Sequence, residues 1–575
     1  MKYETYNRFI AIPTIASLIL LSYALLAIAD TPAIGYELSI YSATPKIFWV
    51  AILFGLANGI ILISSGFYRS KRIWIVGMLQ ILLCNCCVIS LYALRGYVSY
   101  FGRGDISSYI GMSKDVSNYG NFGSNMYPVI SILISQLSQL TNIPILALSK
   151  YVAPLFFALY FLGIYCWSKA IIPDRRFVLS SLIAATPILF AWFSISIQHE
   201  ALCVFTLPFF FYLLQKNSDS RFSAFCIIFF ILYPFFHPLI ALFCFFYLIL
   251  FSILGKLHIN KMVSRLFLAV SFVVLVGWFI QQANLVHFIT TILYQISGLV
   301  ELPTASNIAL GYLDRLGVYT AVRSILSMVS DEIIFSFLSL LVISQIIWRR
   351  KHELYGISMC FLCGNLIFIT AFFLTRSLVV RTFNLNFNMI FTPLLVGFLL
   401  YKFIVDNRRV RAFLIISMIL VSTFIALFSL YPSPLTYRPN NHVTFAEVKG
   451  MDWLINYKNI EIKTADILSP VFRYADLIYG VKFKRQRSDL ADPNMRIYIQ
   501  DHFGLENITI VSPTFPIDED RYLVITEYEV KAFTELWKDM DRFEKEDFIK
   551  VDFCNNVDKI YENGEFRSYV VHKDD

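Results

Sequence analysis

Two carboxylates, Asp105 and Asp115, lie in a polar stretch that separates two apolar parts of the chain. The stretch covers residues 101–128 and is rich in glycine, serine and asparagine. Carboxylates beside a bilayer are costly unless they line a wet cavity or bind a ligand. The pattern therefore predicts a functional site in this loop, with Asp105 first and Asp115 second as catalytic carboxylates. The alternative interpretation is a solvated connector.

Three further positions suit a site on the same side of the membrane. Asp105 and Tyr109 are four residues apart, so a short helix starting near Gly104 would place both on one face. The pair His199-Glu200 ends an apolar segment, where it suits a metal ligand, an acid/base pair or a hydrogen-bonded interface pair. His237 lies in a Pro-Phe-Phe-His-Pro turn and is expected at the outer rim.

Two arginines, Arg376 and Arg381, lie in a late connector at the predicted membrane rim. A guanidinium binds phosphate in a bidentate manner, so these residues suit a phosphate or pyrophosphate carried on a lipid. The alternative is that both side chains reach towards lipid headgroups from the ends of their spans.

Composition places these residues in a membrane protein. Of the 575 residues, 57% are hydrophobic and only 15% are charged, and the mean hydropathy is +0.63, which excludes a soluble globular chain. Apolar runs long enough to cross a hydrocarbon core of about 30 Å recur up to about residue 430. We count about thirteen and expect a polytopic α-helical protein. The segment 201–254 is the hardest to divide.

Charge predicts the orientation. Residues 431–575 hold 19 Lys and Arg against 26 Asp and Glu, whereas residues 1–430 hold 29 against 14. In 1–430, 20 of the 29 basic residues fall in alternate connectors, as the positive-inside rule requires. This pattern predicts a multi-pass protein of the cell membrane with a cytoplasmic N-terminus. It places the 95–127 loop and the tail outside. Because topology explains the basic excess, nucleic acid is not an expected partner.

The region 431–575 is expected to be a separate soluble α/β domain outside the membrane. Residues 445–457 have helical spacing, 508–511 and 522–525 are typical of strands, and 529–548 are typical of a charged helix. Asn563-Gly564 lies between alternating apolar residues and predicts a hairpin. The membrane domain is accordingly expected to cover 1–430.

These residues together resemble the GT-C superfamily of integral membrane glycosyltransferases, which includes oligosaccharyltransferases, protein O-mannosyltransferases and aminoarabinose transferases. The resemblance rests on short motifs: Gly104-Asp105, Tyr127-Pro128, His237-Pro238, Arg381, and a soluble tail with Glu447, Asp452-Trp453-Leu454 and Tyr561-Glu-Asn-Gly. The tail looks like those of archaeal members. The resemblance covers nearly the whole chain in layout.

The resemblance implies transfer of a sugar from a polyprenyl- or dolichyl-phosphate-linked donor to a glycan, lipid or protein acceptor on the outer face. Asp105 would be the general base or a ligand of a divalent metal, Mg²⁺ or Mn²⁺. The chain lacks an Asp-X-Asp pair in this loop and the Trp-Trp-Asp signature of oligosaccharyltransferases, since Trp453 follows Asp452. Two other interpretations remain: a polysaccharide polymerase or ligase, and a transporter of glycan lipids.

Overall fold

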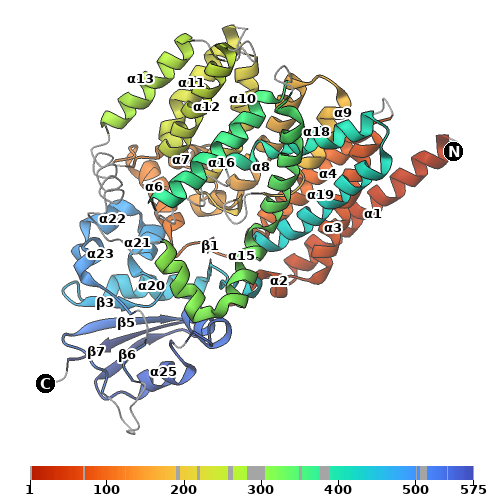
Figure 1. Cartoon of the computed structure of the whole chain (residues 1–575). Helices are drawn as coiled ribbons and strands as arrows, with labels where there is room; N and C mark the ends of the chain where they lie inside the picture. Colours follow the sequence, from red (N-terminus) through yellow and green to blue (C-terminus); the bar gives the residue numbers. More distant parts are fainter. Residues whose placement is uncertain are drawn as a thin grey trace.

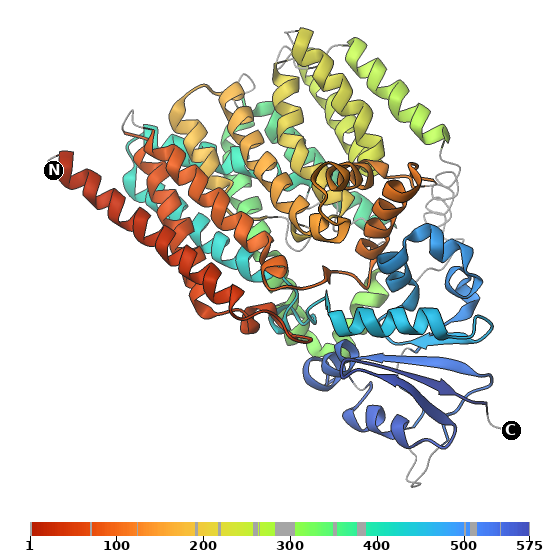
Figure 2. The same ribbon diagram turned by 180° about the vertical axis from the view of Figure 1, so that it is seen from behind.

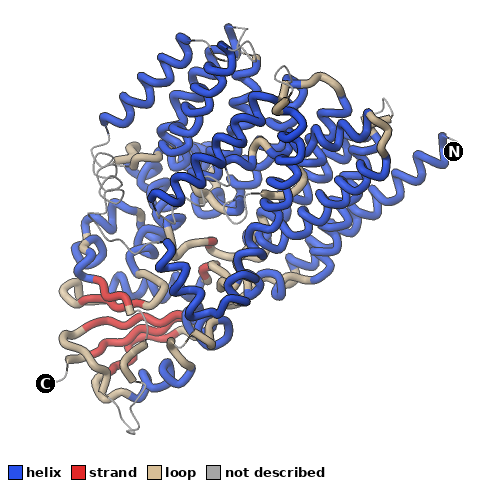
Figure 3. The backbone as a smooth tube through the Cα atoms, in the orientation of Figure 1, coloured by secondary structure: helices blue, strands red, loops and turns tan. Residues whose placement is uncertain are grey.

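The computed structural model gives the arrangement of most of the chain (Figure 1). It describes residues 3–573 except 69–71, 124, 190–193, 217–219, 257–262, 264, 282–304, 349–352, 376–386, 500–501, 506–513 and 541. Helices make up the larger part, and a five-stranded sheet lies at one end of the molecule (Figure 3).

In the described part, six helical segments are long and apolar enough to cross a membrane. They are Ala11–Ala29, Lys46–Ser65, Ile145–Ile171, Gly317–Ile346, Phe387–Val405 and Arg409–Ser429. Seven shorter apolar helices accompany them: Ile73–Ile89, Pro128–Thr141, His199–Gln215, Arg221–Phe236, Pro238–Leu254, Leu266–Gln281 and Tyr355–Ile367. A multi-spanning membrane protein is therefore confirmed, while the number of about thirteen spans and the orientation stay predictions.

The apolar helices pack around one large core. Their bounds are α1 Tyr3–Ala29, α3 Lys46–Ser65, α4 Ile73–Ile89, α8 Ile145–Ile171, α9 Arg175–Ala184, α10 His199–Gln215, α11 Ser220–Phe236, α12 Pro238–Lys256, α13 Arg265–Gln281, α15 Ala305–Ile346, α16 Tyr355–Thr375, α18 Thr392–Val405 and α19 Arg409–Ser429. The long apolar run after residue 220 divides at His237, as predicted. Pro238 begins α12 because a proline at the first helical position loses no intrahelical hydrogen bond.

The predicted polar loop folds into short elements between α4 and α8. These are α5 Leu91–Leu94, β1 Ser99–Tyr100, α6 Asp105–Tyr119 and α7 Pro128–Thr141; α2, Ile40–Ala43, belongs to the first connector. Strand β1 pairs with β2, His442–Val443, so the loop is joined by backbone hydrogen bonds to the C-terminal region. Figure 2 shows this part of the chain beside the C-terminal region, where α6 packs on its helices.

The C-terminal region is an α/β structure with helices on both faces of its sheet (Figure 1). The strand order is β4-β3-β5-β7-β6, with β3 parallel to β4 and β5, and β7 antiparallel to β5 and β6. The strands are β3 Lys463–Asp466, β4 Arg496–Tyr498, β5 Arg521–Thr526, β6 Val557–Glu562 and β7 Phe566–Val571. The last two form the hairpin predicted around Asn563-Gly564.

The side chains of β5 alternate between the two faces of the sheet, and each face is covered by its own layer of helices. Tyr522 and Val524 pack towards α20, Phe445–Tyr457, and α21, Val471–Tyr479, whereas Leu523 and Ile525 pack towards α25, Lys545–Lys550. Successive side chains of a strand point to opposite faces, so one strand supplies both cores. The shorter helices are α22 Val481–Gln486, α23 Ser488–Ala491 and α24 Glu527–Lys531, and 3-10 turns cover 434–436, 493–495 and 551–553.

One predicted element is wrong. Residues 529–548 form α24, a π-helical turn at Ala532–Leu536 and α25, in place of a single charged helix. The π-helical turn closes where the Trp537 backbone N–H donates to the Ala532 carbonyl at 2.8 Å, and the indole Nε1 of Trp537 donates to the Tyr437 carbonyl at 3.1 Å. A new helix then starts where the Asp547 carboxylate accepts from the Glu544 backbone N–H at 2.8 Å. Residues 445–457 form the predicted helix, and 508–511 lie outside the described residues.

Candidate active site

Helix α6, which carries Asp105, lies directly on α21 of the C-terminal region. A Cβ added to Gly111 would come within 2.5 Å of the Asp476 carbonyl oxygen, so no larger residue fits this crossing. The Lys114 ammonium donates to the carbonyls of Leu477 at 2.7 Å and Ile478 at 2.9 Å, both in the last turn of α21. A cation there also suits the negative end of the helix dipole.

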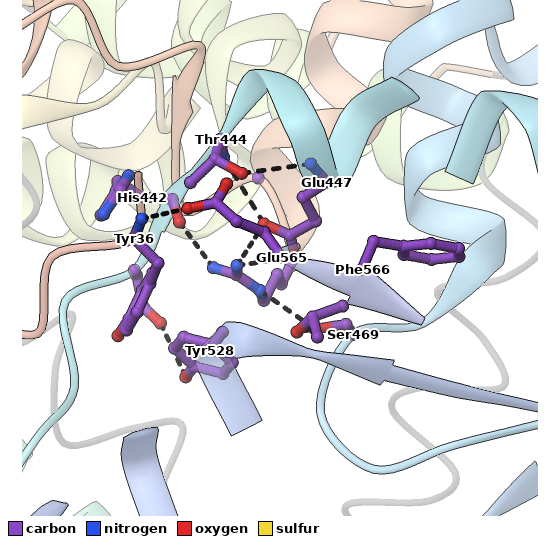
Figure 4. A network of polar contacts seen from close by, with 12 residues as sticks. Tyr36, His442, Thr444, Glu447, Ser469, Tyr528, Glu565 and Phe566 are labelled. Carbon is purple, nitrogen blue, oxygen red and sulfur yellow. Dashed lines mark hydrogen bonds and ion pairs between the residues drawn. The ribbon is translucent and has the colours of Figure 1, made fainter. Parts of the chain in front are cut away.

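The chain before α6 is anchored by Arg103, a residue that we did not single out from the sequence. Its guanidinium is buried and donates to both oxygens of Glu447 at 2.7 and 2.5 Å, to the His442 carbonyl at 2.8 Å and to Ser469 Oγ at 3.1 Å. The ring of Tyr528 lies 3.9 Å from the guanidinium carbon. Figure 4 shows the polar network in which these partners lie.

The partners of Arg103 are themselves held in place. Glu447 closes the capping box at the start of α20 with Thr444, and its Oε1 accepts from the Tyr474 hydroxyl. Burial raises the pKa of the Glu447 carboxyl, while Arg103 and the Tyr474 hydroxyl oppose that rise. Ser469 follows β3 at the carboxyl edge of the parallel strands, where open α/β sheets commonly bind ligands. Here Nε of Arg103, from the polar loop, donates to Ser469 Oγ.

Asp105 begins α6 and remains accessible. Its side chain is 64% exposed, and Oδ1 forms an ion pair with Nη2 of Arg473 at 2.6 Å. Nη1 of Arg473 donates to Ser108 Oγ, also at 2.6 Å. Ser108 in turn donates to the Asp476 carboxylate at 2.5 Å. The carboxylate predicted to be catalytic is thus open to a substrate and is held by a cation from a distant part of the chain.

One helical turn after Asp105, Tyr109 belongs to a group of aromatic rings that contact one another. The Tyr109 and His199 rings stack with centroids 4.1 Å apart. Tyr127, the residue before α7, contacts the rings of His199 at 5.8 Å and His237 at 5.2 Å. Burial raises the pKa of the Tyr109 hydroxyl, and the nearby Glu200 and Asp105 carboxylates raise it further.

The acid and the two histidines of this group do not pair as the sequence suggested. Glu200 reaches His237, with 3.4 Å between Oε1 and Nε2, while its sequence neighbour His199 lies under Tyr109. Within the described residues, neither ring nitrogen of His199 has a hydrogen-bond partner, and Oε2 of Glu200 has none. Buried polar atoms without partners are rare in folded proteins, which makes these atoms candidates for contact with a polar ligand.

The predicted residues divide into three groups. Asp105, Tyr109, His199, Glu200 and His237 come together, and we call these five residues with Tyr127 the site cluster. Asp115 does not join the contacts described for this cluster: its Oδ2 accepts from the Lys482 backbone N–H at 2.8 Å at the start of α22. Arg376 and Arg381 lie outside the described residues.

Asp115 has a clear structural task. A Cβ on Gly480 would lie 2.3 Å from its Oδ1, and Gly480 has a φ of 105°, a backbone conformation that disfavours other residues. Burial raises the pKa of the Asp115 carboxyl, and the bonds from the backbone of Lys482 and Val481 oppose that rise. Its catalytic role stays a prediction.

Sequence reasoning missed Arg473 and Ser108 as neighbours of Asp105 and did not include Tyr127 among the substrate-binding residues. A sequence feature could have identified Tyr127, because Tyr127-Pro128 precedes the helix that follows the polar loop. Arg473 had none, since it is 368 positions from Asp105 in the sequence.

The predicted Mg²⁺ or Mn²⁺ at Asp105 finds no ligand set among the residues that the structure describes. In that part of the chain, no group of three or more His, Cys, Asp or Glu side chains is arranged to hold a metal ion. The Asp105 carboxylate is instead paired with a guanidinium. The metal at Asp105 stays a prediction, and no chemical step is assigned to it.

No family model and no curated protein matches the chain. Solved structures do. The oligosaccharyltransferase of Archaeoglobus fulgidus, in complex with Zn and sulfate, is 11% identical with a TM-score of 0.43, and the alignment covers 83% of this chain and 70% of that one. The same enzyme, tethered with an acceptor peptide containing the NVT sequon, gives the same identity and TM-score over 82% and 70%.

A second similar protein is ArnT from Cupriavidus metallidurans, solved bound to undecaprenyl phosphate. It is 9% identical with a TM-score of 0.45, and the alignment covers 86% of this chain and 98% of that one. Both proteins are GT-C glycosyltransferases. At these identities and TM-scores the likeness concerns the overall layout of the chains alone.

Proposed function

We propose that the chain is a membrane glycosyltransferase that moves a sugar from a polyprenyl- or dolichyl-phosphate-linked donor to an acceptor hydroxyl or amide on the outer face of the cell membrane. The observation that carries the proposal is the site cluster itself. An exposed carboxylate, Asp105, lies at the edge of a buried aromatic group in which polar atoms of His199 and Glu200 have no hydrogen-bond partner among the described residues. Four separate segments of the chain converge to form it.

Each part of the cluster has a chemical task in such a transfer. The Asp105 carboxylate takes the proton of the acceptor group as its oxygen or nitrogen forms a bond to the anomeric carbon. The bond from that carbon to the phosphate oxygen breaks, and the electron pair leaves with the phosphate. The rings of Tyr109 and Tyr127 offer flat apolar faces for the sugar, while the free atoms of His199 and Glu200 are available for its hydroxyls.

The arrangement supports an enzyme more than a transporter of glycan lipids. A transporter binds its substrate near the middle of the membrane, between helix repeats. The site cluster instead lies where α6, α7 and the first turn of α10 meet, and α6 is docked on the soluble α/β region. A carboxylate placed there meets both a lipid-borne donor and a water-soluble acceptor. Membrane lipids are the expected surroundings of the donor.

The deciding experiment is sugar transfer from labelled lipid donors in vesicles that contain the full chain. Asp105→Asn should lower the rate by about 100-fold or more, because a positioned general base contributes roughly that much. Asp558→Asn is the matched control, since this carboxylate is 73% exposed and belongs to strand β6. Equal transfer by wild type and Asp105→Asn would refute the assignment, and an arm with chelator would test the predicted metal.

A further inference from the structure

The ion pair between Asp105 and Arg473 connects the proposed base with the C-terminal region. Arg473 lies on α21, and its side chain is 24% exposed, against 64% for Asp105. The pair therefore lies at the surface of the junction, beside the site cluster. An arginine thus lies next to the carboxylate that is proposed to accept a proton.

Holding the two regions together does not require this pair. The junction already has the buried Arg103–Glu447 pair, the bonds from Lys114 to two carbonyls, and the bond from the Lys482 backbone to Asp115. Ion pairs between exposed side chains contribute little to stability because water screens them and ordering them costs entropy. The Asp105–Arg473 pair therefore contributes little to the stability of the junction, which the other contacts maintain.

Arg473 keeps its orientation without Asp105. Its Nη1 donates to Ser108 Oγ at 2.6 Å, and its guanidinium carbon lies 5.0 Å from the ring centre of Phe472, the preceding residue. The bonds to Ser108 and Asp105 use two of the five N–H donors of the guanidinium. A planar donor group fixed in this way binds a phosphate in a bidentate manner.

Further positive charge surrounds the same ring. The guanidinium of Arg496 lies 3.7 Å from the centre of Phe472, and the ammonium of Lys484 lies 5.4 Å from it. Lys484 is paired with Asp476 at 2.8 Å, so its charge is partly neutralised. Arg473 is the member of this group that reaches the carboxylate of the site cluster. Asp105 and Asp476 supply carboxylates to the same group, so exchange of Asp105 for another anion would keep the charge of Arg473 matched.

We infer that Arg473 binds the phosphate of the lipid-linked donor and exchanges Asp105 for that phosphate when the donor arrives. The inference rests on the proposed function and adds a donor-binding residue from the C-terminal region. While Asp105 is paired with Arg473, its Oδ1 is occupied by a guanidinium N–H. Loss of that partner to the phosphate frees the carboxylate to take the acceptor proton, so donor binding prepares the base.

The same contact serves the bond-breaking step. As the bond between the anomeric carbon and the phosphate oxygen breaks, the electron pair moves to the phosphate, whose added charge is met by the guanidinium. The proton from the acceptor ends on Asp105, and no oxidant, reductant or further reactant is needed. Arg473 thus binds the leaving group, and Asp105 acts on the nucleophile.

The test measures binding of undecaprenyl phosphate to the detergent-solubilised full chain. Arg473→Gln should weaken binding roughly ten- to hundredfold, the loss expected for a charge-assisted contact, and Arg473→Lys should retain part of it. Asp105→Asn should tighten binding about two- to fivefold, because the competing carboxylate is gone. Lys482→Gln is the control: it removes a cation of the same region whose ammonium lies over Tyr119.

A purely structural ion pair predicts a different result. Asp105→Asn and Arg473→Gln would then weaken binding alike and lower the melting temperature alike, and that outcome overturns the inference. So does tight binding by Arg473→Gln. Inorganic phosphate and vesicles containing phosphatidylglycerol serve as separate arms, and binding of anionic vesicles equal to that of undecaprenyl phosphate would assign Arg473 to lipid headgroups instead.

Transfer kinetics separate the inference from the proposed function. If the wild type transfers sugar, Arg473→Gln should raise the donor KM while the acceptor KM stays unchanged. Transfer by the wild type with an unchanged donor KM in Arg473→Gln would refute the inference alone. Absence of transfer by the wild type from any lipid donor, with undecaprenyl phosphate still bound through Arg473, would refute the function and leave the phosphate site.

Discussion

Replacement of Arg103 by methionine tests how the polar loop is fixed to the C-terminal region. The guanidinium makes four hydrogen bonds to buried partners, two of them to the Glu447 carboxylate. Arg103→Met leaves that carboxylate buried, with the Tyr474 hydroxyl and the Thr444 backbone as its remaining donors. Breaking one side of a buried ion pair costs about 3 to 5 kcal/mol, because the other charge stays desolvated.

The expected change is large enough to measure by thermal unfolding. For a structure of 150 to 250 residues, 1 kcal/mol shifts the melting temperature by about 2 to 4 °C, so Arg103→Met should lower the transition of the C-terminal region by roughly 6 to 20 °C. Tryptophan fluorescence of the detergent-solubilised chain reports it, since Trp453 and Trp537 belong to that region. Transfer activity should fall in parallel, because Asp105 follows two residues later.

Two further variants decide whether charge is the cause. The double variant Arg103→Met with Glu447→Met should recover much of the loss, since well-packed apolar side chains often replace a buried ion pair at little cost. Lys463→Met is the control: its pair with Glu519 at 2.6 Å is exposed and should contribute at most about 1 kcal/mol. The reasoning is wrong if Arg103→Met melts like Lys463→Met, or if the double variant melts below Arg103→Met.

Three other predictions follow from the same structure. Burial raises the pKa of the Asp466 carboxyl to about 7, so the folded state binds this proton more tightly than the unfolded chain does. The C-terminal region should lose stability as the pH rises from about 4 to about 7, and Asp466→Asn should flatten that slope in melting curves at pH 5 and 8; an unchanged slope contradicts the assignment. Tyr109→Phe keeps the ring on His199 and should retain transfer within about tenfold, whereas Tyr109→Ala should lose more than that; equal activities would show that the stack is dispensable. Gly480→Ala places a Cβ against Asp115 at a φ of 105° and should cost about 1 to 3 kcal/mol in thermal unfolding; a wild-type melting temperature would disprove the strain.

Much of the fold was predictable because its signals are local. The apolar runs gave the membrane helices, the helical spacing of 445–457 gave α20, and Asn563-Gly564 gave the final hairpin. Helix α6 was also expected, with Asp105 and Tyr109 on one face. The prediction failed at 529–548, where a π-helical turn interrupts the helix and the indole of Trp537 donates to the distant Tyr437 carbonyl. Tertiary contacts overrode the local pattern there.

The candidate site was predictable in its residue types and partly in its membership. Asp105, Tyr109, His199, Glu200 and His237 were selected because polar groups at the ends of apolar segments gather on one side of a membrane. Their pairing was not predictable: His199 meets Tyr109, and Glu200 meets His237. Side-chain pairing depends on the rotation and tilt of each helix, which packing sets.

By itself, the sequence determined a membrane protein with an acidic polar loop early in the chain and an α/β tail, because hydrophobicity, charge and alternation act over tens of residues at most. Only the tertiary structure decided that the C-terminal region binds this loop through hydrogen bonds and ion pairs. Arg103 meets Glu447 over 344 positions, and Arg473 meets Asp105 over 368. No local pattern encodes such contacts, since they exist only after the sheet of the tail has formed and presented α20 and α21 to the loop.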